Sequence, residues 1–256
     1  MQKVYFVGAG PGDPELITVK GRRLLDEADV VVYAGSLVNP KILDGLKAKV
    51  YDSSSLNLDE TTQILVDAIK SGLMAVRLHT GDTSFYSAIT EQIERLRLHE
   101  IDYEVVPGVS SAMAGAALLG QELTIPEVSQ TVIFTRLEGR TPVPETERLN
   151  SLAKHKCTMV IFLSVAMIDR VCDELLQGGY QPETEVVVIE KATWPEQRVV
   201  RGTISNIAKI VRDAGIKRTA LIYVGDALKA SRVAMDKQSR LYAPGFSHGY
   251  RKSSCP

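Results

Sequence analysis

The chain has 256 residues, of which 45% are hydrophobic and 24% charged, and its formal net charge is −1. This length allows one large domain or two of ordinary size, each with a buried core. The near-zero charge gives no field that would attract nucleic acid or an anionic membrane. No apolar run reaches the roughly 18 residues that a membrane-spanning helix needs. We therefore expect neither nucleic acid nor a membrane as a partner.

The cysteines are odd in number and widely spaced, at Cys157, Cys172 and Cys255. This pattern matches neither a disulfide framework nor a zinc site, so we expect no bound metal. The N-terminal residues enter a strand at once, without the charged and apolar regions of a signal peptide. Together these features predict a protein of the reducing cytoplasm.

The first element is a strand that runs into a glycine-rich turn. Val4 to Val7 is a short run of apolar, β-favouring residues, and glycines follow at 8, 10 and 12. Asp13 can cap a helix, and Pro14 suits the first helical position. The sequence therefore predicts strand, tight turn and helix, with backbone N–H groups at the turn open to a ligand.

Two known nucleotide-binding motifs resemble this turn, the dinucleotide fingerprint and the P-loop. A dinucleotide fingerprint needs GxGxxG and an acidic residue after the second strand. Here Asp13 stands in the place of the third glycine, and the strand over 30–33 runs into Ala-Gly-Ser without a carboxylate. A P-loop is excluded because no Gly-Lys-Ser/Thr follows. An ordinary structural turn between strand and helix stays open as the alternative to a ligand site.

The first half of the chain alternates strands and helices. Further strands are expected at 30–33, 49–51, 74–78 and 103–106. Helices are expected at 14–28, 41–46, 58–69, 84–98 and 112–119. Val19 belongs to the apolar face of the first of these helices, and Ser110 caps the last. Repeated βα units of this kind favour a mostly parallel sheet.

The second half begins after residues 120–130, which lack periodicity and contain Pro126. Strands are then expected at 131–135, 158–163, 185–189, 198–201 and 220–224, and helices at 149–155, 167–176 and 205–214. We predict the fold class α/β, with an N-terminal domain over 1–119, a linker over 120–130, a C-terminal domain over 131–242 and a tail over 243–256.

Small and polar residues follow several of the expected strands. They occur in the segments 8–13, 79–83, 107–111, 164–166 and 191–193. Ligands of open α/β sheets bind beyond the carboxyl ends of strands, where small residues allow close approach to the backbone. Asp82 is the most prominent polar residue there, with helix capping as its ordinary alternative. A lone His79 is more typical of a structural hydrogen bond than of catalysis.

Three stretches, VGAGPGDPELITVKG, the HTGD turn before an aromatic-containing helix, and VVPGVSSAMAG, resemble the tetrapyrrole methylases, which use S-adenosylmethionine. The resemblance covers nearly the whole chain. LTIPEVSQTVIFTRLEGRTPVPE, KATWPEQRVVRGT and FSHGYRK further resemble one branch of that family. The resemblance implies two α/β domains with the active site in the cleft between them. It also implies a homodimer, a tetrapyrrole substrate, and S-adenosylhomocysteine as the product of the cofactor.

The resemblance assigns roles to particular residues. It implies cofactor contacts at Pro11, Thr80, Gly81, Asp82, Phe85, Ser110, Ser111, Leu163, Ala192 and Ala220. It implies substrate contacts at Gly10, Asp13, Arg136 and Arg140. The two arginines lie in a branch-specific loop, where they would hold substrate carboxylates. An ordinary ion pair with Glu138 is the alternative role.

Two residues depart from the family pattern, since Thr83 replaces a usual proline and Ser87 a usual glycine. They leave the shape of this turn open but keep Gly81 and Asp82. The implied activity is methyl transfer to a ring carbon, with residues 137–145 selecting which carbon is presented. A methylase for another ring carbon and a non-catalytic tetrapyrrole-binding module stay open as alternatives. No catalytic residue and no metal state of the ring follow from the sequence.

Overall fold

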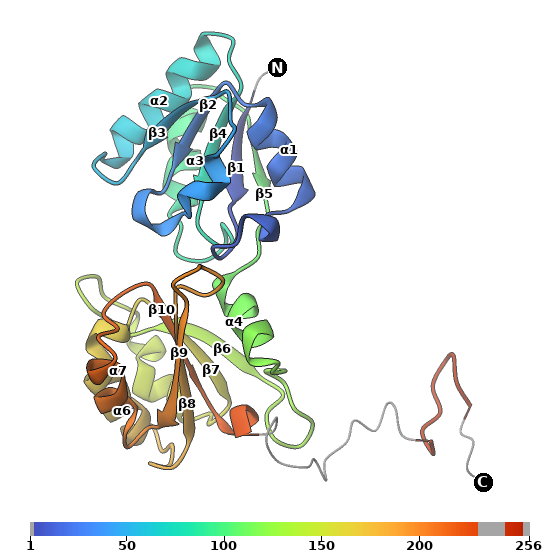
Figure 1. Cartoon of the computed structure of the whole chain (residues 1–256), viewed down its shortest axis with the longest axis vertical. Coiled ribbons are helices and arrows are strands. Elements are labelled where there is room, and N and C mark those ends of the chain that lie inside the picture. Colours follow the sequence, from blue (N-terminus) through green and yellow to red (C-terminus); the bar gives the residue numbers. More distant parts are fainter. Residues whose placement is uncertain (1–2, 230–243, 253–256) are drawn as a thin grey trace. The chain divides into compact units, whose positions relative to one another are not determined.

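The computed structural model describes residues 3–229 and 244–252 (Figure 1). By its contacts the chain divides into two compact units. The first contains Met1–Gly115 and Lys191–Gln197, and the second contains Ala116–Glu190 and Arg198–Pro256. Each unit is built around its own five-stranded sheet, so the predicted α/β fold class with two α/β parts is confirmed.

The sheet of the first unit is entirely parallel. Its strands are β1 (Val4–Gly8), β2 (Val30–Tyr33), β3 (Lys49–Asp52), β4 (Ala75–His79) and β5 (Tyr103–Val106). They lie in the order β3-β2-β4-β1-β5. The prediction of a mostly parallel sheet is therefore confirmed, and all five carboxyl ends lie at one edge.

Helices cover both faces of this sheet (Figure 1). They are α1 (Val19–Glu27), α2 (Leu58–Lys70) and α3 (Ile89–Leu98), whereas α4 (Ser111–Leu119) follows β5 and runs from the first unit into the second. Phe6 packs with α2 and α3 residues on one face, and Val7 packs with α1 residues on the other. Central parallel strands are buried on both sides, which explains why β1 and β2 read as continuous apolar runs.

The first predicted helix is wrong in its N-terminal part. Residues Pro14–Leu16 form a single 3₁₀ turn, in which Asp13 accepts a hydrogen bond from Glu15 N at 2.9 Å. The α-helix begins at Val19 because the Thr18 hydroxyl accepts from Gly21 N, which caps a new start. Val19 is 90% exposed and does not belong to the buried face.

The helix predicted over 84–98 is also shorter than expected, and it begins at Ile89. Tyr86 and Ala88 adopt left-handed backbone with φ of 53° and 50°. The Ser87 hydroxyl donates to Phe85 O at 3.1 Å, which gives this segment a local alternative to helical bonding. Similarly, the short helix predicted over 41–46 is a 3₁₀ turn over Pro40–Leu43.

The sheet of the second unit is mixed. Its strands are β6 (Val132–Arg136), β7 (Thr158–Phe162), β8 (Glu185–Glu190), β9 (Arg198–Thr203) and β10 (Ala220–Val224). In the order β6-β7-β10-β8-β9, only β6 and β7 pair in parallel. Helices α5 (Leu149–Ala153), α6 (Ile168–Gln177) and α7 (Ile207–Asp213) pack on one face and enclose a common apolar core.

Residues 120–130, expected as a linker, fall with the second unit. Buried Thr158 on β7 holds this segment twice: its hydroxyl donates to Leu123 O at 2.8 Å, and its N–H donates to Ser129 Oγ at 2.9 Å. Gln121 Nε2 donates to Ala227 O at 2.6 Å. The domain limits at 1–119 and 131–242 stay predictions.

The expected tail lies partly outside the described residues, as do residues 230–242 of the expected second domain. Within the tail, residues 244–252 are described, and His248 and Arg251 form an isolated β-bridge there. In the two described ranges, no helix has the length and apolar character needed to cross a membrane.

Replacing Thr158 by valine tests how firmly residues 120–130 are held. Thr158→Val keeps the side-chain volume but leaves Leu123 O without its donor. We expect the free energy of unfolding to fall by about 1–3 kcal/mol in urea denaturation. Thr203→Val, whose hydroxyl bonds Ser205 at the surface, is the control and should change stability by less than about 0.5 kcal/mol. Equal effects of the two variants would contradict this anchoring role.

Candidate functional site

The loops that follow β1, β4 and β5 meet at the carboxyl edge of the first sheet. Gly81 N donates to Gly10 O at 2.8 Å, and Gly10 N donates to Gly81 O at 3.2 Å. Asp82 reaches the third loop, because its Oδ2 accepts from Gly108 N at 2.7 Å. Since ligands of parallel sheets bind beyond this edge, these loops form the candidate site of the first unit.

Two glycines permit the loops to approach this closely. A Cβ on Gly108 would lie 2.2 Å from Gly81 O, and one on Gly8 would lie 2.6 Å from Gly108 Cα. Gly81 needs glycine for a different reason, since its φ is +61°. A Cβ on Gly81 would meet no atom nearer than Ser111 N, at 3.7 Å. A Cβ there would touch the Ser110 and Ser111 backbone only at ordinary van der Waals distance, so the backbone conformation, not the packing, requires glycine at this position.

Asp82 braces the turn with both carboxylate oxygens. Besides the bond to Gly108, its Oδ1 accepts from Ser84 N at 2.8 Å. Burial alone would raise the pKa of Asp82, but these hydrogen bonds outweigh it and hold the pKa below the ordinary 3.8. Asp82 is thus charged at neutral pH. It caps this turn, whereas α3 begins only at Ile89.

The position of His79 at the end of β4 does not suit an acid–base group. Its ring is buried and stacks on Phe6 with the centroids 6.1 Å apart. Burial, and then the positive charge of Arg77, lower the pKa of His79 to about 3, so it is uncharged at neutral pH. Arg77 remains charged, with burial lowering its pKa to about 10, and it donates to Gln92 and Val32 O.

The glycine turn is less open than its sequence suggests. Ala9 N donates to His79 O at 2.7 Å, and Asp13 N donates to Thr193 Oγ1 at 2.9 Å. Two carbonyls are also occupied: Pro11 O accepts from Trp194 Nε1, and Gly12 O accepts from Asn39 Nδ2 at 2.7 Å. The expected row of open N–H groups is therefore wrong. Only Gly12 N–H lacks a hydrogen-bond partner among the turn's donors within the described residues.

The departures from the family pattern leave the turn intact. Thr83 is buried, and its hydroxyl has no partner among the residues that the structure describes. Ser87 is used locally, as described above. Ser110 caps α4 as predicted, since its hydroxyl accepts from Ala112 N at 3.3 Å. The arrangement of Gly81 and Asp82 is thus compatible with threonine and serine at these two positions.

In the second unit, other predicted site residues gather at one edge of its sheet. Arg136 ends β6 and Phe162 ends the parallel strand β7 beside it. Leu163 follows in left-handed conformation, with φ of 53° and 66% of its surface exposed. Ala220 begins the antiparallel strand β10 and pairs with Glu190, the last residue of β8. Arg136, Leu163 and Ala220 therefore share an edge.

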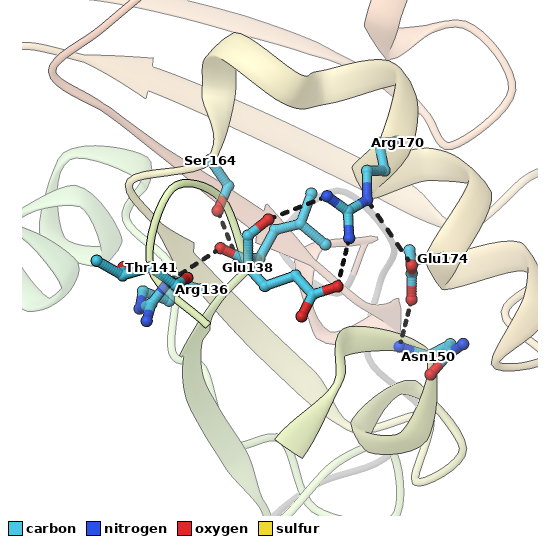
Figure 2. A network of polar contacts seen from close by, with 8 residues as sticks. Arg136, Glu138, Thr141, Asn150, Ser164, Arg170 and Glu174 are labelled. Atoms are coloured by element: carbon cyan, nitrogen blue, oxygen red, sulfur yellow. Dashed lines mark hydrogen bonds and ion pairs between the residues drawn. The ribbon is translucent and has the colours of Figure 1, made fainter. Parts of the chain in front are cut away.

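A polar network anchors the loop that follows β6 (Figure 2). Leu137 N donates to Ser164 Oγ at 2.8 Å. Arg170 on α6 donates to the carbonyl of Glu138 at 3.1 Å and to its carboxylate at 2.8 Å. Arg170 also approaches Glu174, which accepts from Asn150 N at 3.2 Å. The start of the loop is thus fixed to Ser164, which follows β7, and to α6.

The two arginines of this loop differ in what they contact. Arg136 donates to the carbonyl of Thr141 at 3.1 Å (Figure 2) and to that of Pro142 at 2.7 Å, so it holds the loop's own backbone. Arg140 has no hydrogen bond or ion pair with any residue in the described ranges. Glu138 pairs with Arg170, so the alternative of an ion pair between Glu138 and the loop arginines is wrong.

The predicted site residues divide between the two units. The first unit holds Gly10, Pro11, Asp13, Thr80, Gly81, Asp82, Phe85, Ser110, Ser111 and Ala192. The second unit holds Arg136, Arg140, Leu163 and Ala220. Their roles as ligand contacts, and a common site for both sets, stay predictions.

Three residues that contact the glycine turn were missed from the sequence, namely Asn39, Thr193 and Trp194. The last two lie in the branch-specific stretch KATWPEQRVVRGT, in which the resemblance assigns a role only to Ala192 and Thr193 is expected only as part of the segment 191–193. The sequence separation between Asp13 and Thr193 is 180 residues, so no local pattern indicates the contact. In the described ranges no cluster of His, Cys, Asp or Glu has the composition of a metal site.

Comparison with known families assigns the class of this protein. Residues 3–208 match the family model described as Tetrapyrrole (Corrin/Porphyrin) Methylases. This match covers most of the chain, and the chain belongs to that family. The resemblance found in the sequence motifs is confirmed.

Individual relatives agree with this class. The cobalt-precorrin-4 C(11)-methyltransferase of Methanocaldococcus jannaschii is 55% identical over 254 residues, covering 98% of this chain and 97% of that protein. The X-ray structure of a cobalamin biosynthetic cobalt precorrin-4 methyltransferase matches with TM-score 0.86 and 48% identity, covering 88% of this chain and 95% of that one. Uroporphyrin-III C-methyl transferase from Thermus thermophilus, complexed with S-adenosyl homocysteine, matches with TM-score 0.76 and 28% identity, covering 89% and 99%.

Replacing Asp82 by asparagine tests its role in the turn. Asparagine has one acceptor oxygen for two backbone donors, so we expect the free energy of unfolding at pH 7 to fall by about 1–2 kcal/mol. Because the folded pKa lies below 3.8, the carboxylate stabilises the fold above that pH. The contribution disappears as the pH falls through the folded pKa. The stability difference between wild type and Asp82→Asn should therefore shrink under acid.

Denaturation series between pH 7 and pH 2 measure this difference. Asp44→Asn makes the same charge change at an exposed residue and serves as the control. A difference that stays constant with pH would contradict the stabilising role of the ionised Asp82.

Proposed function

We propose that this protein transfers a methyl group from S-adenosylmethionine to carbon 11 of precorrin-4 or cobalt-precorrin-4, a step in building the corrin ring of cobalamin. The observation that carries the proposal is similarity over nearly the whole chain to relatives named for this reaction. The branch-specific stretches around Arg136 and Trp194 predict the same reaction from the sequence.

The first unit fits the methyl donor. S-adenosylmethionine combines a nucleoside with an amino acid, so it needs close access to backbone as well as polar partners. The junction of the loops at Gly8, Gly81 and Gly108 has no side chains and gives the access, and the Gly12 N–H, which has no partner among the described residues, offers a donor. The residues that would hold it are those implied by the family resemblance: Pro11, Thr80, Gly81, Asp82, Phe85, Ser110, Ser111 and Ala192, with Leu163 and Ala220 from the second unit.

Bound S-adenosylmethionine supplies a methyl group that is already electrophilic, so the protein's main task is alignment of the reactants. Asp82 contributes by fixing the turn around Gly81, since both its oxygens accept backbone N–H groups. Neutral, buried His79 supports the end of β4 and moves no proton at physiological pH.

Arg140 is the leading candidate for binding a substrate carboxylate. A precorrin carries many carboxylates, and a guanidinium binds such groups with paired, charge-assisted hydrogen bonds. Both terminal nitrogens of Arg136 donate to loop carbonyls, whereas the donors of Arg140 have no partner in the described part of the chain. Arg136 therefore shapes the loop, and Arg140 binds a substrate carboxylate. Gly10 and Asp13 are the proposed substrate contacts of the first unit.

We also propose that the protein works as a homodimer in the cytoplasm. The dimer rests on the family resemblance, and the cytoplasm on the cysteine pattern and the reaction. Sedimentation should give a mass near twice that of the 28.0 kDa chain.

The reaction is tested with cofactor carrying a ¹³C-labelled methyl group. We expect one labelled methyl at carbon 11 when precorrin-4 and its cobalt form are supplied side by side, as read by carbon NMR of the products. Comparison of the two yields identifies the preferred metal state of the ring. A label at another carbon would place the protein in another branch. Calorimetric binding of tetrapyrrole without any label transfer would favour a non-catalytic binding module.

Replacing Arg140 by alanine tests substrate binding. We expect affinity for the tetrapyrrole to fall about 10- to 100-fold, because a charge-assisted hydrogen bond contributes about 1.5–3 kcal/mol. S-adenosylhomocysteine affinity and the melting temperature should stay unchanged. Arg148→Ala removes an exposed arginine of the same segment and is the matched control. Loss of affinity for both ligands in Arg140→Ala would indicate a structural role instead.

A further inference from the structure

The segment Lys191–Gln197 connects β8 to β9 in the chain but belongs to the first unit by its contacts. Two of its side chains contact the glycine turn of residues 10–13. Trp194 Nε1 donates to Pro11 O at 2.9 Å, and Thr193 Oγ1 accepts from Asp13 N at 2.9 Å. Trp194 therefore satisfies an acceptor of the turn, the Pro11 carbonyl, and Thr193 satisfies a donor of the turn, the Asp13 N–H.

The indole ring of Trp194 also explains why residue 12 is glycine. A Cβ on Gly12 would lie 2.1 Å from Trp194 Cδ1 and 2.4 Å from Nε1. Gly10, in contrast, needs glycine for its φ of +79°. Gly12 is thus required by packing against an aromatic ring, and any side chain there would displace the indole.

The segment is held in a shape that presents both side chains. Thr193 has a φ of 68°, a conformation that β-branched residues rarely adopt. Its N–H donates to Gln197 Oε1 at 2.8 Å, and Trp194 N donates to Lys191 O at 2.9 Å. Lys191 Nζ lies 5.4 Å from the centre of the indole ring. Strained backbone that is retained in this way is typical of functional sites.

These contacts complete the bonding of the glycine turn. Gly10 bonds Gly81 in both directions, Gly12 O accepts from Asn39, and Pro11 O and Asp13 N are bound by the segment. Gly12 N–H remains as the donor without a partner in the described ranges. A ligand therefore meets a turn that is already ordered, and it gains affinity because it need not order the turn itself.

We propose that Thr193 and Trp194 are positioning residues, which hold the glycine turn in the shape that binds S-adenosylmethionine and the tetrapyrrole. They act through Pro11, Gly12 and Asp13. This proposal rests on the proposed function for the identity of the ligands, but not for the geometry of the contacts.

Matched substitutions separate positioning from general stability. Thr193→Val keeps the side-chain shape and removes the acceptor for Asp13 N, whereas Thr193→Ser keeps the hydroxyl. Trp194→Phe keeps an aromatic ring and removes the donor to Pro11 O. We expect S-adenosylhomocysteine to bind about 3- to 10-fold more weakly to Thr193→Val and Trp194→Phe, in calorimetry well below the melting temperature. Thr193→Ser should stay within about two-fold of wild type.

The outcomes distinguish the two proposals. If wild type fails to bind S-adenosylhomocysteine, the proposed function is contradicted. If wild type binds and the Val and Phe variants bind equally well while only their melting temperatures fall, the positioning role is contradicted and the segment is merely structural. Trp194 is the only tryptophan of the chain, so its fluorescence reports on the turn directly. Addition of S-adenosylhomocysteine to wild type should shift the Trp194 emission, and an unchanged spectrum would contradict the contact between ligand and turn.

A double-mutant cycle gives a second test. Gly12→Ala should weaken S-adenosylhomocysteine binding in wild type, because the methyl group meets the indole. In a Trp194→Ala background the same substitution should have a smaller effect, since the ring is gone. Strictly additive effects would show that Trp194 does not act through residue 12.

Discussion

The close approach of three backbone segments is the constraint on which the first unit's site depends. The loops after β1, β4 and β5 pass within contact distance at Gly8, Gly81 and Gly108, and a single methyl group on Gly8 or Gly108 would separate them. Parallel strands place their carboxyl ends at one edge, but they do not bring the following loops together. The glycines do so, and the bonds between Gly10 and Gly81 then fix the loops in register.

The charges near this junction are arranged to stabilise it. Asp82 directs both carboxylate oxygens at backbone N–H groups, which keeps it ionised although it is partly buried. Arg77 is buried beneath the same strand end, and its donors are matched by Gln92 and a backbone carbonyl. Its positive charge helps to keep His79 neutral. The polar residues of β4 and its loop therefore support a backbone surface rather than supplying a reactive side chain. This suits a reaction that depends on alignment.

Much of this arrangement can be predicted from the sequence, for identifiable reasons. Most strands are short runs rich in β-favouring apolar residues, so the sequence predicts their positions to within a residue or two. The errors at residues 14–18 and 84–88 have one cause, because short polar side chains there bond the nearby backbone and displace the helix start. The partners of Asp13 and Glu138 could not be predicted. Those contacts join residues 180 and 32 positions apart, and no periodic pattern encodes them.

The proposed role of the loop after β6 is to select one ring carbon, and the long-range contacts of this loop suit that role. Methyl transfer needs the reacting atoms within roughly 3–3.5 Å, so a small rotation of the macrocycle changes the carbon that is methylated. A flexible loop could not hold the macrocycle in one orientation. Here Arg136 ties two carbonyls of the loop together, and Arg170 holds Glu138 to α6. Pro142 and Pro144 restrict the backbone further. Arg140 is then carried on a loop of defined shape, so a carboxylate bound to it would be held at a fixed place relative to the second sheet.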